Sequence, residues 1–306
     1  MKLAWGNNPS FVVNLATQAD SRKHIDSLEA SRHYLDFDDL QSLEIRSSEW
    51  TGSTWGQASQ WLLAHDSMAS PRQYGALPWE LEWAYKRLVR AMAADSANTS
   101  TSYMRTMRAA ADLGHYIADA HVPLHTTGNY DGQRTGQRGI HALWETHALE
   151  WMLSPSEHRF CPQQGQLEMY DPVWTPWEII QESHAMVPDV IRAEKEWNVV
   201  CQHHGWGFRR RGRTLTFLPN PEALATWDSL THWTTWPRFC RSANRIAAAW
   251  HAAWCDAGKP NLTAEPTDPN RKFIQSYFSW MEDFIAHWRG LFLNHQNGKA
   301  AKHLDS

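Results

Sequence analysis

The chain has 306 residues, 42% of them hydrophobic and 20% charged, and its formal net charge at pH 7 is −4. This length supports a hydrophobic core without help from disulfides, and the negative charge argues against binding to duplex nucleic acid through a broad basic surface. No apolar run approaches the roughly 18 residues that cross a bilayer, and residues 1–8 are too short for a signal peptide. We therefore expect neither a transmembrane segment nor an export signal.

Two helices are predicted in the first part of the chain. Apolar residues recur at helical spacing over residues 80–94 and 102–120. Leu77-Pro78-Trp79 places a proline in the first turn of the first helix, and Pro123 ends the second. Each helix therefore has a start or stop signal in its own sequence.

The second half of the chain is also predicted to be helical. Residues 126–139 contain four glycines and are expected to form a loop. Helical periodicity then resumes over residues 140–152, 176–197 and 237–256. A weak strand-like alternation at Thr214-Leu215-Thr216-Phe217 is the exception. The expected fold class is all-α.

A change of composition after Pro260 separates the end of the chain from the rest. Residues 261–269 are rich in turn-forming residues, and residues 272–293 have the pattern of an aromatic amphipathic helix. This helix is expected to dock on the core, the alternative being a membrane or a partner surface. We therefore expect a main domain over residues 1–262, followed by a linker and a terminal helix over residues 263–306.

Two further features are judged from composition alone. The basic run from Arg209 to Arg213 is expected to be a solvated loop, or else a contact for an anionic partner. The four cysteines include no C-x-x-C motif, so a zinc-thiolate site is not expected. Disulfide pairing would require an oxidising compartment, and the sequence leaves the redox state of the cysteines open.

The most informative pattern is a set of histidines and carboxylates between residues 114 and 145. It consists of His115-x3-Asp119, a histidine in Pro123-Leu124-His125, and His141-x3-Glu145. Residues four apart share one face of a helix, so each pair can close on one cation. Imidazole and carboxylate without thiolate are typical of zinc sites that keep a position open for water. The pattern predicts a hydrolytic metal centre, the alternative being helix-surface contacts among the 17 histidines of the chain.

Polar residues near these candidate ligands have simpler interpretations. His121 and His147 lie two positions away from the ligand face of their helices, so we expect structural roles for them. Structural roles are also expected for His184 and Trp144. An aspartate at position 36 or 38 is a candidate to hold the second nitrogen of a ligand histidine, the alternative being an acidic surface.

Upstream, Asp20 in Ala19-Asp20-Ser21-Arg22 precedes His33 by thirteen residues. The other signature phrases are Glu29-Ala-Ser-Arg-His-Tyr-Leu-Asp36, Leu113-Gly-His-Tyr-Ile-Ala-Asp-Ala-His-Val-Pro-Leu-His125, Gly139-Ile-His-Ala-Leu-Trp-Glu145 and Trp254-Cys-Asp-Ala-Gly-Lys-Pro-Asn-Leu262. Together they resemble the zinc-dependent phospholipase C and single-strand-specific nuclease superfamily of the S-one/P-one type. The chain is most similar to the bacterial phospholipase C-like branch, from about residue 9 to residue 262. The resemblance is specific because ligand identity, order and spacing agree.

The resemblance implies a multi-helix domain with zinc ions in a helix-lined cleft. One zinc would be held by Asp20, His33, His115 and Asp119, and a second by His125, His141 and Glu145. Asp119 would also bridge to a third ion, which in the family is otherwise held by an N-terminal tryptophan and by a histidine shortly after it. Two zinc ions are therefore expected, with a third depending on the start of the chain.

The chain departs from the family pattern at two places. Trp5 lies only fifteen residues before Asp20, and no histidine precedes His24. Either the natural start has been lost or this branch lacks the third metal, and we favour a truncated start. The family also places a positive charge three residues after its first aspartate to meet the phosphate. This position is Lys23, with Arg22 beside it, and we assign the role to one of the two.

These residues predict a zinc-dependent phosphodiester hydrolase. A hydroxide held near the ion of Asp20 and His33 would attack phosphorus, and the second ion would bind a phosphate oxygen or the leaving group. Asp20 would orient the water or accept its proton.

The expected substrate follows from the resemblance, which leaves the compartment open. The branch similarity and a glutamate at position 145 favour a phospholipid substrate. The alternatives are a nuclease that stacks the bases of single-stranded DNA or RNA on aromatic side chains, and a metal-binding protein without activity. The family is mostly exported whereas this chain shows no leader, so compartment and oligomeric state remain open.

Overall fold

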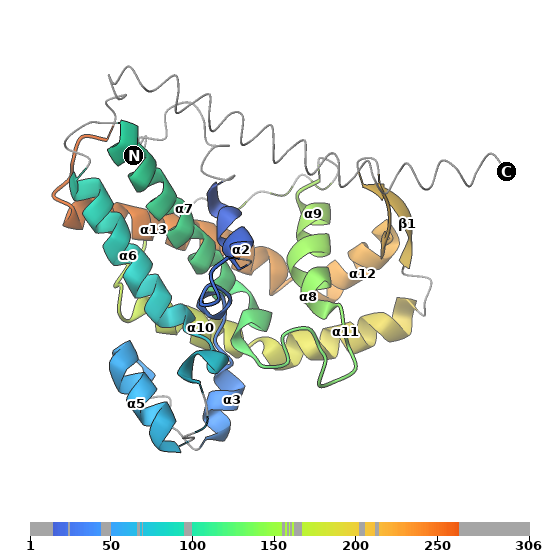
Figure 1. The fold of residues 1–306 in the computed structure, drawn as a ribbon. Coiled ribbons are helices and arrows are strands. Elements are labelled where there is room, and N and C mark those ends of the chain that lie inside the picture. Colours follow the sequence, from blue (N-terminus) through green and yellow to red (C-terminus); the bar gives the residue numbers. More distant parts are fainter. Residues whose placement is uncertain are drawn as a thin grey trace.

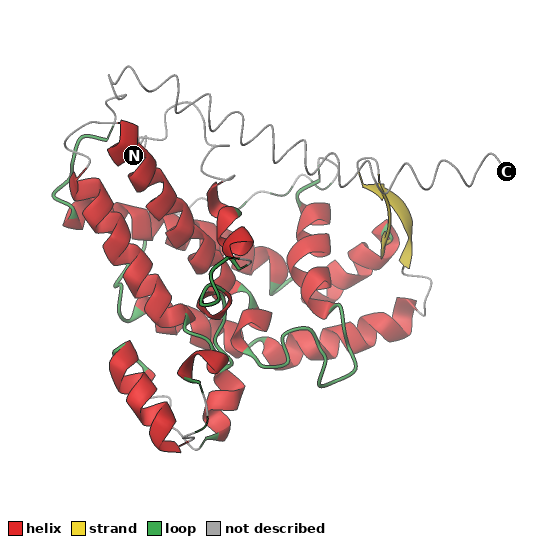
Figure 2. Cartoon of the chain, in the orientation of Figure 1, coloured by secondary structure: helices red, strands yellow, loops and turns green. Residues whose placement is uncertain are grey.

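Most of the described chain forms α-helices, with one β-hairpin as the only sheet among the described residues (Figures 1 and 2). This computed structural model describes residues 15–23, 25–43, 50–65, 68, 70–94, 100–154, 157, 159, 161, 167–201, 206–211 and 214–262. The expected all-α class is confirmed. The predicted linker and terminal helix over residues 263–306 lie outside the described residues, as do Trp5 and His24.

The described elements occur in the following order along the chain. The α-helices are α2 (Gln18–Arg22), α3 (Phe37–Ser42), α5 (Trp55–His65), α6 (Leu77–Ala94), α7 (Ser100–His121), α8 (Ile140–Ala142), α9 (Ala148–Met152), α10 (Thr175–His184), α11 (Val187–Cys201), α12 (Pro221–Thr231) and α13 (Thr235–Asp256). The 3-10 helices are η1 (Ala30–Arg32), η2 (Pro71–Tyr74) and η4 (Pro123–Thr126), and η5 (Leu143–His147) is a π-helical turn between α8 and α9. The hairpin consists of β1 (Trp206–Arg211) and β2 (Thr214–Pro219).

The largest hydrophobic cluster lies among α6, α7 and α13, which pack against one another (Figure 1). Tryptophan supplies much of it: the indoles of Trp79 and Trp177 meet edge to face, with ring centroids 5.1 Å apart. Gly114 faces α13, where a Cβ atom on this residue would lie 3.4 Å from the ring of Trp250. This contact fixes α7 next to His115, in the C-terminal half of the helix, which also carries Asp119.

A second cluster lies among α9, α11, α12 and the helical turns that precede α9. Trp144, Trp197 and Trp227 are fully buried in it. The indole of Trp144 donates to the hydroxyl of Thr234, which confirms its expected structural role. Because α13 contacts α7 and α6 as well as α9, it joins this cluster to the first. The two hydrophobic clusters thus support the two halves of the candidate site.

Two predictions about elements need correction. The helical pattern over residues 176–197 is two helices, α10 and α11, interrupted at Ala185 and Met186. Pro188 explains the break, because its ring would clash with the carbonyl of residue 184 and it has no N–H to donate. Part of the predicted basic loop, Arg209 to Arg211, lies instead in β1, which pairs antiparallel with β2. The predicted strand at Thr214–Phe217 is confirmed as part of β2. Its pairing with Arg209 to Arg211 explains why these residues form a strand, and this pairing cannot be seen in the sequence around them.

The cysteines differ in state. Cys161 and Cys240 form a disulfide that ties a loop residue to α13, while Cys201 and Cys255 are free thiols. Among the described helices, none is both long enough and apolar enough to cross a membrane.

Candidate metal centre

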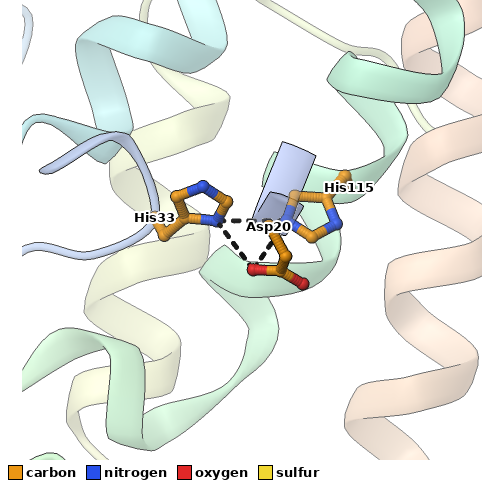
Figure 3. Close-up of side chains that lie close together, drawn as sticks. All are labelled: Asp20, His33 and His115. Carbon is orange, nitrogen blue, oxygen red and sulfur yellow. Dashed lines mark hydrogen bonds and ion pairs between the residues drawn. The ribbon is translucent and has the colours of Figure 1, made fainter. Parts of the chain in front are cut away.

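The first group of candidate ligands combines three separate segments of the chain. Asp20 projects from α2, His33 follows η1, and His115 lies in the C-terminal half of α7, with their side chains converging on one point (Figure 3). His33 Nδ1 lies 3.0 Å from His115 Nε2. Asp20 Oδ1 lies 3.8 Å from His33 Nδ1 and 3.9 Å from His115 Nε2. Residues that are far apart in sequence thus present three donor atoms to one small volume.

Asp119, one helical turn after His115, completes this group. Its Oδ2 lies 2.8 Å from His33 Nδ1 and 3.3 Å from His115 Nε2. Four donors about 2.0–2.2 Å from a tetrahedral zinc lie about 3.3–3.6 Å from one another. The donor atoms of Asp20, His33 and His115 lie 3.0–3.9 Å from one another, and Asp119 lies 2.8 and 3.3 Å from the two histidines. These spacings are close to those of a zinc site.

A segment next to η2 holds His33 in place. Leu35 forms an isolated antiparallel bridge with Gly75, and its N–H donates to the carbonyl of His125 over 2.9 Å. Gly75 has φ +88°, and a Cβ atom there would lie 2.0 Å from the carbonyl oxygen of Tyr34. A glycine is required at this position because both the backbone angle and the close approach exclude a side chain.

The second group lies beside the first. His141 Nε2 and His125 Nε2 approach the same oxygen of Glu145, Oε2, at 2.7 and 3.3 Å. The Nδ1–H of His125 donates to the carbonyl of His33 over 2.5 Å, and that of His141 donates to the carbonyl of Tyr130 over 3.2 Å. With Nδ1 protonated, each neutral ring would turn a lone pair toward the carboxylate. A cation among these three atoms, or a second proton on the rings, removes that repulsion.

The local backbone explains how Glu145 reaches the two histidines. Gly139 adopts a left-handed conformation, with φ +98°, just before α8 begins. His141 lies in α8, while Glu145 lies in the π-helical turn η5 that follows. Single π-helical turns are rare and occur frequently at functional sites. His141 and Glu145, four residues apart, therefore meet as predicted, but on a helix that is locally widened by a π-helical turn.

The electrostatics of both groups favour a bound positive charge. Burial alone would lower the pKa of His125, but the charges of Asp119 and Glu145 outweigh it and raise this pKa to about 9. Burial would raise the pKa of Glu145, yet hydrogen bonds from His125 and His141 hold it well below its usual range. The pKa of Asp119 is likewise lowered, because His115, His125 and His33 outweigh its burial. Both groups therefore stabilise cations in a partly dry environment.

Solvent can reach one side of this centre. The side chains of Asp20 and Glu145 are 56% and 34% exposed, whereas that of Asp119 is only 6% exposed. A cavity of about 310 Å³ lies elsewhere, between Trp50, Gln57 and Trp61. The predicted helix-lined cleft around the ligands stays a prediction.

Lys23 and Arg22, the two candidates for a phosphate contact, differ in their surroundings. Lys23 Nζ lies 2.6 Å from Asp20 Oδ1, at the edge of the first group. The guanidinium of Arg22 turns inward, where it bonds to Asp112, Glu29 and the hydroxyl of Tyr116 over 3.0–3.1 Å. Arg22 has its donors engaged inside the protein, so Lys23 is the better placed of the two.

Two sequence interpretations of neighbouring groups change. Asp38 accepts from the hydroxyl of Thr127 and the N–H of Gly128, so it holds a loop and not a ligand histidine. Asp36 lies near Asp38 and Asp39, and burial together with these charges raises its pKa to about 7. Neither aspartate has a hydrogen bond to a ligand histidine among those of the described residues.

The other predicted structural roles hold where contacts are seen. His121 is buried and bonds through Nδ1 to the carbonyl of Ile117. His184 bonds to the carbonyl of Thr126 and packs against Phe37.

Sequence reasoning missed Glu29, which is completely buried next to His33. Burial would raise its pKa, but hydrogen bonds from Tyr116 and Arg22 hold it at about 2. The signal was present, because Glu29 precedes His33 by four residues, the same spacing that marked the other pairs.

The chain was compared with known proteins by sequence and by structure. No protein-family model, curated protein or solved structure matches it. Any function must therefore be argued from the two groups of side chains themselves.

Proposed function

We propose that this protein is a zinc-dependent phosphodiester hydrolase of the phospholipase C and single-strand nuclease type, acting on phospholipids. The observation that carries the proposal is that six expected ligands gather in two adjacent groups of three, and that the seventh, Asp119, contacts His33 and His115. These ligands come from α2, from the turn after η1, from α7 and η4, and from α8 with η5. A chance arrangement of helix-surface pairs would not bring Asp20 and His33 onto the face of α7 that carries His115 and Asp119.

The donor set fits zinc at both positions. It contains imidazole nitrogens and carboxylate oxygens, and no thiolate, as in zinc sites that activate water. When bound, zinc supplies a lowered pKa for a water ligand and positive charge for phosphoryl oxygens. Asp20, His33, His115 and Asp119 would hold one ion, and His125, His141 and Glu145 the other. The backbone bond from His125 Nδ1 to the His33 carbonyl keeps the two groups adjacent.

The remaining side chains of the centre supply positioning and proton transfer. Asp20 is the most exposed of the expected ligands, so its carboxylate can orient an incoming water or accept its proton. Lys23 offers a point charge to a phosphate oxygen, in exchange for its present bond to Asp20. Asp20 and Lys23 both act on the solvent-facing side of the site, where a phosphodiester can approach.

A phospholipid substrate is supported by the surface that follows α2. Ile25 is 88% exposed and Leu28 is 45% exposed, and both lie in the segment that joins Asp20 to His33. Exposed apolar side chains close to a catalytic group suit an interface with acyl chains. This agrees with the branch of the family that the chain resembles most.

A nuclease remains the second candidate because of Tyr130. Its side chain is 54% exposed, and its ring lies edge-on to His141 with centroids 6.2 Å apart. A base of single-stranded nucleic acid could stack on such a ring while its phosphate reaches the second group.

Metal content and substrate choice test the proposal together. We expect about two zinc ions per chain and release of phosphorylated head group from phosphatidylcholine vesicles, abolished by a chelator and restored by zinc. Cleavage of single-stranded DNA without lipid hydrolysis would select the nuclease, and bound zinc with neither activity would select a metal-binding protein.

A pair of variants tests the role of the ligands in this reaction. His115→Ala should abolish turnover and lower the zinc content, whereas His232→Ala, an exposed histidine bonded to the carbonyl of Ser229, should retain both. Full activity in His115→Ala would contradict the proposal.

A further inference from the structure

We propose that Glu29 is a positioning residue that selects which nitrogen of His33 binds the metal. The inference rests on the proposed metal centre and assigns a role to a buried carboxylate outside the seven ligands. Glu29 would accept the Nε2–H of His33, so that Nδ1 keeps its lone pair for the ion.

The two nitrogens of His33 face different partners. Nδ1 points to the ligand group, 2.8 Å from Asp119 Oδ2 and 3.0 Å from His115 Nε2. Nε2 points away from that group, 3.5 Å from Glu29 Oε1, and has no hydrogen-bond partner in the present geometry. His33 is 2% exposed and Glu29 is 0% exposed, so solvent cannot replace a partner for Nε2. A small approach of the two side chains would form the bond.

Glu29 is itself held by three residues. Tyr116 donates its hydroxyl to Oε1 over 2.6 Å, Arg22 donates to the same oxygen over 3.1 Å, and Arg32 bonds to Oε2. Tyr116 follows His115 on α7, and its ring packs edge-on against the imidazoles of both His33 and His115. The orientation of the carboxylate is therefore fixed by the same helix that supplies two ligands.

Two carboxylates compete for the single proton of a neutral His33 ring. Asp119 faces Nδ1, and Glu29 faces Nε2. A proton on Nδ1 would bond to Asp119 and block the metal, whereas a proton on Nε2 leaves Nδ1 free. Without Glu29, Asp119 is the only one of the two carboxylates that can accept the proton, which then lies on Nδ1. Metal binding would require that this proton first be removed from Nδ1.

The test measures zinc affinity and the tautomer of His33 in the full-length protein. Loss of such outer partners weakens metal binding about 10–100-fold, and we expect a loss of this size for Glu29→Ala by competition with a chromophoric chelator. Glu29→Gln should lose less, because its amide oxygen can still accept from Nε2. Nitrogen-15 NMR of the metal-free protein should show the proton on Nε2 in the wild type and on Nδ1 in Glu29→Ala.

Two control variants separate the inference from the proposal on which it rests. Glu80 is a buried carboxylate that also pairs with Arg32 but otherwise bonds to Arg87, so Glu80→Gln should keep wild-type affinity. His33→Ala should lose one zinc ion, and unchanged zinc binding in this variant would overturn the metal centre and the inference with it.

Other outcomes bear on Glu29 alone. If His33→Ala loses zinc while Glu29→Ala keeps wild-type affinity and an Nε2 proton, the inference is wrong and the centre stands. If Glu29→Ala does not fold, a wild-type spectrum with the proton on Nδ1 would still overturn the role of Glu29.

Discussion

At the scale of single residues, Asp36, which lies near the candidate site in sequence, lowers the stability of the folded protein when its carboxyl group is ionised. It precedes α3 without capping it, and it lies among Asp38 and Asp39. Burial and these two charges raise its pKa from 3.8 to about 7. The folded protein therefore binds this proton more tightly than the unfolded chain, and stability that is present below about pH 4 is lost as the pH rises through about 7.

We expect Asp36→Asn to be more stable than the wild type at pH 8 and equally stable near pH 4. The full pKa shift corresponds to about 4 kcal/mol, and screening of this half-buried group reduces the expected gain to about 1–3 kcal/mol. Urea unfolding between pH 4 and pH 8 measures the difference, with Asp189→Asn on the surface of α11 as the control. A gain that does not depend on pH would contradict the explanation.

At the scale of elements, the segment from His33 to Leu35 depends on Gly75. The bridge between Leu35 and Gly75 and the bond from Leu35 N–H to the carbonyl of His125 connect η1, η2 and η4. These short elements have few apolar residues of their own, so their placement depends on close backbone contact. The position of His33 is therefore set by a glycine that binds no metal.

We expect Gly75→Ala to destabilise the protein by at least about 2 kcal/mol, because it combines a disfavoured backbone angle with a clash. The matched control is Gly136→Ala, where φ is +74° but nothing lies within 4 Å of a new Cβ atom. That variant should cost about 1 kcal/mol. Denaturant unfolding of both proteins measures these costs, and equal losses would show that the contact with Tyr34 is unimportant.

The helical segment that carries Glu145 departs from regular α-helical geometry at the candidate site. The sequence predicts a regular helix over residues 140–152, whereas the structure contains the π-helical turn η5 within this range. The buried indole of Trp144 anchors this turn to the second hydrophobic cluster. Packing on one side thus supports the unusual backbone that aims Glu145 at His125 and His141.

At the scale of the whole molecule, the proposed metal ions would join distant segments. His33 is separated from His115 by 82 residues and from Asp119 by 86. The first group rests on the cluster around α6, α7 and α13, and the second on the cluster around α9, α11 and α12. Metal binding should therefore stabilise the fold as a whole and not one helix.

We expect zinc to raise the midpoint of thermal unfolding and a chelator to lower it. Free zinc at 100 times its dissociation constant adds about 2.7 kcal/mol per site. The double variant His115→Ala/His141→Ala should lose this zinc-dependent shift, as measured by calorimetry with and without metal. The same shift in the double variant would mean that zinc binds elsewhere.

The chain by itself determined what depends on neighbours along the sequence. Proline and helical periodicity marked α6 and α7, and the four-residue spacing that paired His115 with Asp119 and His141 with Glu145 follows from the pitch of a helix. The same four-residue spacing also relates Glu29 to His33. These features are local, because the backbone dihedral angles and hydrogen bonds within one helical segment fix their geometry.

Only the tertiary structure decided how these local pieces meet. It placed Asp20 and His33 against α7, turned Arg22 inward to Glu29, divided residues 176–197 into two helices, and paired Arg209 to Arg211 with β2. Such contacts join segments that are far apart in the chain, and they depend on packing and backbone fit that no short stretch of sequence contains. Asp38 shows the difference, because the sequence left it as a candidate partner of a ligand histidine or as part of an acidic surface, whereas in the fold it accepts hydrogen bonds from Thr127 and Gly128.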